Sequence, residues 1–556
     1  MTSHLLTTLG RERLEQHYRD GFWRSETIYA LVARQAAQAP DKFAIRDRTR
    51  RLTYAQLVRE ADALARALQH RGIRRGERVA VWVASRVEVA IAVLACSRNG
   101  HVCCPSLHRD HTVDDVASLL ERVRAAALIV QRGFGADSDR KDIVVRAKSI
   151  PSVRLAYVLG TPDEHQGSPL SLPWSEDAAA ESDQAPPRAD PDSVVYLAFT
   201  SGTTGVPKGV MHSDNTLLAN ARTISRDWNI DAASNVYTLS TLSHNLGFGA
   251  MIMTLIVGGE LVVHDLPKGA SLLDRLRETG ATFLFGVPTH AIDLLADMRK
   301  RQASELPKLA GFRVSGAPAP AWVINELLGY GIKPQLGYGM TETCSHQYTH
   351  PGDETRLLTD TVGRACAGYE IKIWQAEKNS VEMPAGQVGE IGGRGASLML
   401  GYYNDQASTE DSFNEHGWFM TGDLGWIDEN GYLRITGRKK DVINRGGHKI
   451  FPAKLEAIAS QHACVERVAA IPVADERLGE RVCIAVEFRA GMKVAPTAIL
   501  EHLDQGGLSK YDMPEYFLEL DRVPLTASGK IRKVEIVEDV KAGRHSPVAI
   551  RHARQA

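Results

Sequence analysis

Short apolar runs alternate with stretches of helical period along most of this chain, and this rhythm constrains the fold most. Residues 78–84 (RVAVWVA) and 126–130 (AALIV) are short apolar runs, whereas residues 52–72 repeat their apolar positions at helical spacing. Strands that alternate with helices in this way predict βα units and a largely parallel sheet. The rhythm returns from 194 to about 374, where the sequence predicts helices over 215–224 and 248–256 and strands over 261–264 and 283–287.

The pattern changes in the last third of the chain. Residues 417–438 predict a β-hairpin whose strands meet at Asn430-Gly431, and further strands are expected over 465–474 and 481–490 with a helix over 495–505. The predicted fold class is α/β. A large N-terminal domain, residues 1–437, combines parallel-type βα sheets with a β-rich subdomain, and a smaller mobile α+β domain follows over 438–556.

Two polar segments are expected to lie outside the regular structure. The stretch 160–194 is rich in Pro, Ser, Asp and Glu, which predicts a surface connection within the large domain. The last stretch, 543–556, is short and basic, and predicts a frayed tail.

Charge and cysteine content exclude several classes of protein. The 66 Lys and Arg nearly balance the 67 Asp and Glu, so no global field draws the chain to nucleic acid or to an anionic membrane. The seven cysteines lack the paired spacing of structural zinc, and the adjacent Cys103 and Cys104 suit a buried strand. With neither a signal-peptide pattern nor an apolar run of about 20 residues, a cytoplasmic chain without a membrane span is expected.

The segment 196–215, YLAFTSGTTGVPKGVMHSDN, carries the clearest chemical signal. An apolar strand runs into a loop of hydroxyl side chains, glycines and one lysine. Backbone N–H groups at the glycines, the hydroxyls and the lysine charge together form a phosphate cradle. It differs from a Walker A loop because Pro207 precedes the lysine and Gly209 follows it. The candidate phosphate-binding residues are Thr200, Ser201, Gly202, Thr203, Thr204 and Lys208.

TSGTTGVPKG resembles the phosphate-loop signature of the adenylate-forming superfamily, which includes acyl-CoA synthetases, adenylation domains and beetle luciferases. Four more segments resemble the family's motifs in the family's order, between about residues 30 and 535. They are GYGMTET at 337–343 (adenine and magnesium), TGD at 421–423 (ribose), 437–456 (the domain hinge) and PLTASGKIRK at 524–533 (the catalytic lysine). The resemblance implies ATP, Mg²⁺ and coenzyme A as cofactors.

The resemblance assigns roles residue by residue. Lys530 would stabilise charge as the acyl-adenylate forms, Glu342 would bind Mg²⁺, and Lys440 would be the hinge. Gly447 would act in thioester formation, within a CoA-binding set of Gly446, Gly447, His448 and Lys449. The implied nucleotide-binding residues are Gly316, Ala317, Pro318, Gly337, Tyr338, Gly339, Met340, Thr341, Asp423, Ile435 and Arg438.

Acyl specificity in this family comes from the residues that line a pocket between the phosphate loop and GYGMTET, here 243–249, 285–289, Gly316, Ala317, Gly337 and Met340. None of those residues is acidic here, and this disfavours amino acids, whose ammonium would need a carboxylate. The glycines leave width for a compact ring or short branched acid, and His244 matches a family position that gates the substrate carboxylate and takes part in catalysis. The predicted acyl pocket is His244, Asn245, Gly247, Phe248, Gly249, Phe285, Gly286 and Val287.

The predicted activity is an ATP-dependent carboxylic acid–CoA ligase that forms an acyl-adenylate and then a thioester. Residues 17–36 and 94–112 resemble bacterial cyclohexanecarboxylate-CoA ligases, while medium-chain and benzoate-like acids stay open. The alternatives are an adenylation enzyme that loads a carrier protein, a luciferase-like oxygenase and a non-catalytic nucleotide-binding relative. Lys208, Glu342 and Lys530 argue against the last. A homodimer and a lysine acetyltransferase or deacetylase acting on Lys530 are partners that the sequence leaves open.

Overall fold

The computed structural model describes residues 10–161, 172–179, 185–188, 190–200, 207–267, 269–303, 306, 308–525 and 531–550. The chain divides into two compact units: unit 1 is residues 1–370 with 393–413, and unit 2 is residues 371–392 with 414–556. The predicted boundary after residue 437 falls inside strand β20 (Leu433–Arg438) of unit 2. We therefore propose residue 437 as the boundary of the part of the chain that moves, and not as the boundary of a compact unit.

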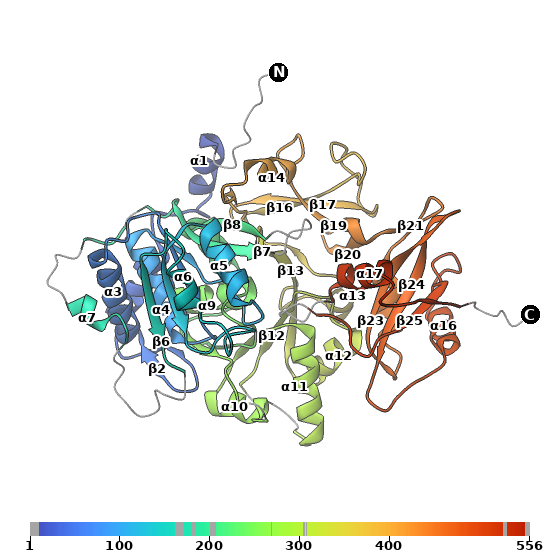
Figure 1. The fold of residues 1–556 in the computed structure, drawn as a ribbon, viewed down its shortest axis with the longest axis horizontal. Helices are drawn as coiled ribbons and strands as arrows, with labels where there is room; N and C mark the ends of the chain where they lie inside the picture. The colour runs from blue at the N-terminus through green and yellow to red at the C-terminus, as the bar shows by residue number, and fades with distance from the viewer. Residues whose placement is uncertain are drawn as a thin grey trace, which may run out of the picture. The chain divides into compact units, whose positions relative to one another are not determined.

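Unit 1 contains a seven-stranded sheet in the order β18-β8-β7-β4-β3-β5-β6, in which β3 to β7 run parallel. Helices α5 and α6 cover one face of it through a core of aliphatic side chains (Figure 1). The adjacent cysteines predicted for a strand are buried in β4. The strands are β3 Arg78–Trp82, β4 Val102–Cys104, β5 Ala125–Gln131, β6 Leu155–Leu159, β7 Val194–Thr200, β8 Lys208–Ser213 and β18 Gly401–Tyr402.

Unit 1 also holds a nine-stranded sheet in the order β15-β14-β13-β12-β11-β9-β10-β1-β2. The six central strands, β13, β12, β11, β9, β10 and β1, are parallel, and β2, β14 and β15 pair antiparallel with their neighbours. The strands are β1 Phe43–Arg46, β2 Arg51–Thr53, β9 Asn235–Thr238, β10 Glu260–Val263, β11 Phe283–Gly286, β12 Gly311–Ser315, β13 Lys333–Met340, β14 Cys344–Tyr348 and β15 Arg364–Ala365.

The helices of unit 1 pack on these sheets and on one another. Nearly every residue of α4 is buried, as expected for a helix enclosed on all sides, and α10, α11 and α12 pack on the second sheet (Figure 1). The helices are α1 Arg11–Arg19, α2 Ile28–Gln38, α3 Tyr54–His70, α4 Val87–Asn99, α5 Val113–Arg122, α6 Ile143–Ala147, α7 Ser175–Ala179, α8 Asp214–Asp227, α9 Asn245–Ile256, α10 Leu272–Thr279, α11 Pro288–Lys300, α12 Ala321–Gly329, α13 Thr355–Asp360 and α14 Gln406–Asp411.

Unit 2 is built on a six-stranded sheet with helices on both faces. A four-stranded sheet, β16-β17-β19-β20, precedes it, and β16 and β17 each have one end in unit 1. The strands are β16 Tyr369–Trp374, β17 Gly389–Gly395, β19 Phe419–Ile427, β20, β21 Ile443–Arg445, β22 His448–Ile450, β23 Val465–Asp475, β24 Gly479–Phe488, β25 Tyr516–Glu519 and β26 Val548–Ala549. The helices are η2 Lys439–Asp441, α15 Pro452–Ala459, α16 Pro496–Gln505 and α17 Lys533–Lys541.

The mixed α/β class is confirmed, with three local differences from the sequence-based expectation. The hairpin β19–β20 forms, but through a five-residue loop, 428–432, in which the Asp428 carboxylate accepts the backbone N–H groups of Asn430 and Tyr432. The segment 160–194 includes helix α7 and the fully buried Trp174. The expected frayed tail contains β26, which pairs with β25.

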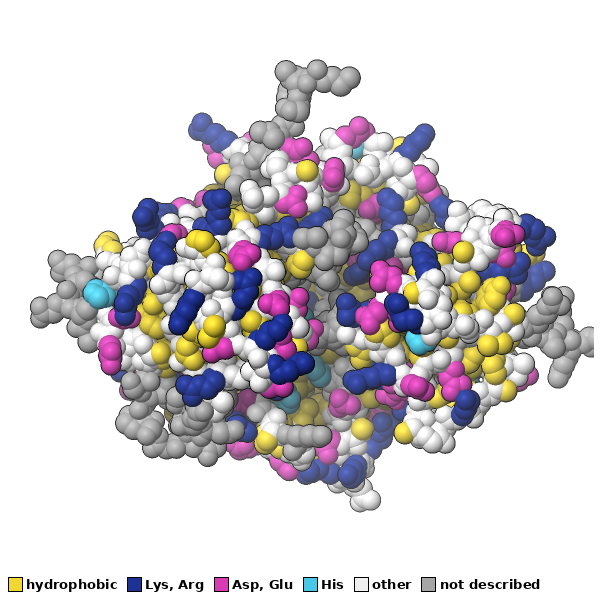
Figure 2. Space-filling view, in the orientation of Figure 1, with side chains coloured by type: hydrophobic (Ala, Val, Ile, Leu, Met, Phe, Trp, Pro, Cys, Tyr) yellow, Lys and Arg dark blue, Asp and Glu magenta, His cyan; other side chains and the backbone are white. Residues whose placement is uncertain are grey.

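The surface agrees with the balanced charge of the sequence. Figure 2 shows Lys and Arg intermixed with Asp and Glu on the visible face of both units. Among the described residues, no helix is long and apolar enough to cross a membrane.

Candidate active site

The phosphate motif lies at the end of a hairpin in unit 1. Strand β7 ends at Thr200 and β8 begins at Lys208, and these two residues are directly paired. The remaining predicted phosphate-binding residues, Ser201, Gly202, Thr203 and Thr204, lie outside the described residues. The Lys208 ammonium lies 4.7 Å from the centroid of the Tyr402 ring, at cation–π distance. The lysine of the motif is thus held against an aromatic face.

Tyr402 also connects this lysine to the predicted magnesium ligand. Its hydroxyl donates a hydrogen bond to Glu342 Oε1 at 2.9 Å. Burial, followed by the Glu342 charge, raises the pKa of Tyr402, so the phenol keeps its proton and donates at neutral pH. Lys208, Tyr402 and Glu342 therefore form one assembly, in which a cation for phosphate lies near a carboxylate for a metal. No sequence motif includes Tyr402, which follows Glu342 by 60 residues.

The donors present fit a magnesium ion that arrives with the triphosphate. Mg²⁺ in such sites is commonly held by one or two carboxylates plus substrate phosphates, and not by a protein cage. No group of three or more His, Cys, Asp or Glu side chains within the described parts of the chain could hold a metal. The Glu342 carboxylate, which contacts the same tyrosine as Lys208, fits a site of one carboxylate plus substrate phosphates.

His212 ties the strand after the phosphate loop to the GYGMTET segment. Its Nε2 lies 2.7 Å from the Thr341 carbonyl oxygen, and because a carbonyl only accepts, Nε2 carries the proton. Its Nδ1 lies 3.0 Å from Thr216 Oγ1. Burial lowers the pKa of His212 to about 4, so the ring is neutral. No residue spacing in the motifs indicates this tertiary contact of His212.

The predicted purine-binding residues lie where parallel strands β12 and β13 end, the edge at which open α/β sheets bind ligands. Gly316, Ala317 and Pro318 form an exposed turn after β12. A Cβ on Gly339 would lie 2.0 Å from the Cys344 carbonyl oxygen, so only glycine fits there. Tyr338 is buried, with its ring 5.4 Å from His346. Gly337, Tyr338, Gly339 and Met340 all belong to β13.

Unit 2 holds the ribose motif in its hairpin. Asp423 on β19 and Arg438 on β20 are paired in register, with Arg438 Nε 3.3 Å from Asp423 Oδ1. The Asp423 carboxylate is buried, whereas half of the Arg438 side chain is exposed. Ile435 lies on the same strand, β20. The structure thus brings together the three residues that the sequence assigned to the nucleotide in this unit.

The predicted CoA segment is an exposed β-turn. Arg445 pairs with His448, so Gly446 and Gly447 are a two-residue hairpin loop with φ of +59° and +91°. Both angles lie in the left-handed region, so the turn itself requires glycine. The His448 Nε2 lies 2.8 Å from Asp512 Oδ1, and Arg445 makes a two-pronged ion pair with Glu515.

The remaining predicted residues of unit 2 differ in their contacts and exposure. Lys449 pairs with Glu377, and Lys440 is exposed within η2. Lys530, the predicted catalytic lysine, lies outside the described residues.

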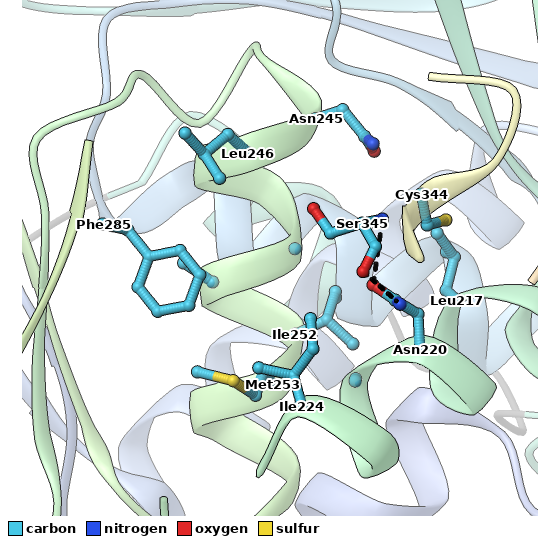
Figure 3. Close-up of a pocket in the computed structure, with 13 residues that line it drawn as sticks. Leu217, Asn220, Ile224, Asn245, Leu246, Ile252, Met253, Phe285, Cys344 and Ser345 are labelled. Carbon is cyan, nitrogen blue, oxygen red and sulfur yellow. Dashed lines mark hydrogen bonds between the residues drawn. The ribbon is translucent and has the colours of Figure 1, made fainter. Parts of the chain in front are cut away.

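A cavity between α8 and α9 of unit 1 is the candidate acyl pocket (Figure 3). The cavity itself is small, about 20 Å³ for a water-sized sphere, and its total empty space of about 410 Å³ includes open solvent. Asn245, Gly249 and Phe285, three of the predicted pocket residues, line it. The other lining residues are Leu217, Asn220, Ala221, Ile224, Leu246, Ala250, Ile252, Met253, Cys344 and Ser345.

The predicted pocket residues that do not line this cavity have other packing. A Cβ on Gly247 would lie 2.3 Å from the Thr241 carbonyl oxygen, and Phe248 stacks on Tyr196 at 4.1 Å. A Cβ on Gly286 would lie 3.0 Å from His290 Nδ1. His244 and Val287 are the residues directly before α9 and α11. Only Gly249 of the three glycines has open space beside it, with no heavy atom within 4 Å of an added Cβ.

The residues of α8 that line the cavity could have been predicted from their helical spacing in the sequence. These residues, Leu217, Asn220, Ala221 and Ile224, follow the i, i+3, i+4, i+7 pattern of one helix face. The Asn220 amide donates to the Ser345 carbonyl at 3.0 Å and accepts from the Ser345 N–H at 3.2 Å, as the dashed lines of Figure 3 show. The polar lining at this wall is therefore already hydrogen-bonded.

The comparisons with known proteins agree with this geometry. A family model described as AMP-binding enzyme matches residues 32–403, and one for the C-terminal domain of these enzymes matches 454–530. The chain is 29% identical over 537 residues to the medium-chain fatty-acid–CoA ligase of Escherichia coli (strain K12), covering 96% of this chain and 94% of that protein. It is 30% identical over 553 residues to a salicylyl-CoA synthase / salicylate adenylyltransferase of Streptomyces sp, covering 97% and 98%.

Solved structures give the same family. ATP-bound MatB from Rhodopseudomonas palustris superposes with a TM-score of 0.81 at 28% identity, over 93% of this chain and 99% of that chain. Acyl-CoA synthetases of this family use ATP, Mg²⁺ and CoA. The chain therefore belongs to the AMP-binding enzyme family, within the adenylate-forming superfamily, and is an AMP-forming acid–CoA ligase.

Proposed function

We propose that this ligase activates a compact apolar carboxylic acid, of the alicyclic, aromatic or medium-chain class, with cyclohexanecarboxylate as the first candidate. The observation that carries the proposal is the cavity between α8 and α9, which has no charged side chain in its lining. Its inner part is aliphatic and aromatic, from Ile224, Ile252, Met253 and Phe285 (Figure 3). Such a lining binds an apolar acyl group by removing its surface from water.

The same lining disfavours acids with a second charge. An unpaired ammonium or carboxylate buried there would lose its hydration without gaining a partner, at a cost of several kcal/mol. The Asn220 amide on α8 is already hydrogen-bonded to the backbone N–H and carbonyl of Ser345. The names of two relatives, a medium-chain fatty-acid–CoA ligase and a salicylyl-CoA synthase, fit the same broad class of acids.

The proposed chemistry divides between the units. The substrate carboxylate oxygen attacks the α-phosphorus of ATP and pyrophosphate leaves; the CoA sulfur then attacks the acyl carbon and AMP leaves. In unit 1, Lys208 and Thr341 would hold phosphates, Glu342 would hold the Mg²⁺ that neutralises their charge, and His244 would lie beside the carboxylate.

In unit 2, Asp423 and Arg438 would bind the nucleotide, and Lys530 would stabilise the charge of adenylation. The Gly446–Gly447 turn would admit the pantetheine arm. Residues after 437 would rotate about Lys440 between the two half-reactions.

Pyrophosphate release with CoA present tests the acid class. A matched pair shares one ring and differs by one charge: cyclohexanecarboxylate and cyclohexane-1,4-dicarboxylate. We expect kcat/KM to be at least about a hundredfold higher for the monoacid, because the second carboxylate would be buried without a partner. The kcat/KM values for benzoate and octanoate then show whether the enzyme prefers an alicyclic, an aromatic or a medium-chain acid. Preference for the diacid would contradict the proposal, and an adenylate that is not passed to free CoA would indicate a carrier protein as acceptor.

A further inference from the structure

His108 is a histidine that the sequence motifs do not include, and it stacks on His244. The two ring centroids lie 4.2 Å apart with the planes 19° from parallel. His108 lies in the segment between β4 and α5, and both histidines belong to unit 1. A near-parallel contact at this distance restricts the rotation of both rings.

His108 is itself held from three sides. The Trp82 indole N–H donates to the His108 carbonyl oxygen at 2.9 Å, and Trp82 is fully buried. The backbone N–H of His108 donates to His111 Nδ1 at 3.2 Å, and the His108 Nδ1 lies 2.9 Å from Ser243 Oγ. Backbone and ring are therefore both fixed, which makes His108 a rigid support for its neighbour.

The charge state of these rings agrees with the geometry. Burial, then the neighbouring His244 and His111, lowers the pKa of His108 to about 2, so its ring is neutral. His111 accepts a hydrogen bond through Nδ1, so that nitrogen carries no proton, and burial lowers its pKa as well. The neutral His108 ring therefore places no charge against the stacked His244 ring.

His244 stands at the entrance of helix α9. It is the N-cap residue, its N–H donates to the Thr241 carbonyl at 3.0 Å, and its carbonyl accepts the Phe248 N–H at 2.8 Å. These bonds fix the backbone of His244, and its side chain makes no capping hydrogen bond. The next residue, Asn245, lines the acyl pocket. His108 contributes the stacked face to the packing around the His244 ring.

We infer that His108 is a positioning residue that holds the ring of His244 in place at the start of α9, one residue before the pocket-lining Asn245, and so tunes the affinity for the acid. The inference rests on the proposed place of His244 beside the substrate carboxylate. His108 does not line the pocket, and its stacked face lies against His244. Its removal leaves the nucleotide assembly of Lys208, Tyr402 and Glu342 intact.

The test compares His108→Ala, which removes the stacked ring, with His108→Phe, which keeps a ring of similar shape. Adenylation is followed by pyrophosphate exchange with whichever acid the wild type prefers. For His108→Ala we expect KM for the acid to rise about tenfold with KM for ATP unchanged, since small misplacements of a positioning group cost this much or more. His108→Phe is expected to restore most of the loss. His462→Ala, which breaks a histidine pair in unit 2, is the matched control.

Ser243→Ala keeps the ring and removes its hydrogen bond, and is expected to raise KM for the acid about threefold. If His108→Ala does not fold, the KM of Ser243→Ala for the acid tests the positioning role of His108. The inference is overturned if His108→Phe binds the acid as weakly as His108→Ala, or if KM for ATP rises in parallel with KM for the acid. Failure of the proposed acid class is a separate result, because it is read from the wild type alone.

Discussion

The two units present their functional residues in opposite ways. In unit 1 the residues near the nucleotide and acyl sites are packed and hydrogen-bonded: His212 is fully buried on Thr341, and Glu342 is bonded to Tyr402. In unit 2 the hinge and CoA segments, Lys440 and Gly446 to Lys449, are exposed. A rigid scaffold keeps a binding site in its productive geometry, whereas exposed turns suit groups that must approach and withdraw. The difference fits a proposal in which unit 1 holds the substrates and unit 2 supplies groups in turn.

Lys530→Ala is the strongest way to break this comparison. If unit 2 contributes the lysine to adenylation alone, pyrophosphate exchange falls on the order of a hundred- to a thousandfold. Thioester formation from preformed acyl-adenylate and CoA stays within about twofold of the wild type, because the proposed rotation about Lys440 withdraws Lys530 before this step. Lys541→Ala, an exposed lysine of α17, is the control. Equal losses in both half-reactions would mean that unit 2 does not divide its groups between them.

Acid unfolding sharpens the comparison through buried histidines. In unit 1, burial lowers the pKa to about 4 for His101, His212 and His290 and to about 3 for His346. The unfolded chain binds these protons below about pH 6.5, and the folded chain only below about 4, so stability is full above 6.5 and declines as the pH falls. Each histidine costs the folded state on the order of 1–2 kcal/mol at pH 5. In unit 2, burial and then the neighbouring His502 lower the pKa of His462, which is only partly buried, so we expect its contribution to be smaller.

Urea unfolding at pH 7.5 and 5.0, with hydrogen exchange resolved by peptide, measures this difference. We expect unit 1 to lose at least about 3 kcal/mol at the lower pH and unit 2 less than about 1 kcal/mol. Equal losses would mean that the buried histidines of unit 1 do not control its acid stability.

The motifs and the βα rhythm could be predicted from the sequence because each lies within one contiguous segment. Tyr402, His212 and His108 could not, because their roles arise from partners brought together by folding. The glycines also show what the sequence cannot predict, which is the space beside each one in the fold. Gly247 and Gly249 look alike in the sequence, but a carbonyl oxygen occupies the space beside one and the other faces open space.

The central claim, that the cavity between α8 and α9 receives the acid, is tested most directly by Gly249→Leu. The larger side chain enters open space without backbone strain, as it does in the control Gly329→Leu at the end of α12. Pyrophosphate release is measured with cyclohexanecarboxylate and with propionate. The account predicts that Gly249→Leu lowers kcat/KM for the ring acid at least tenfold and for propionate by less than about threefold. An equal effect on both acids, or none, would contradict it.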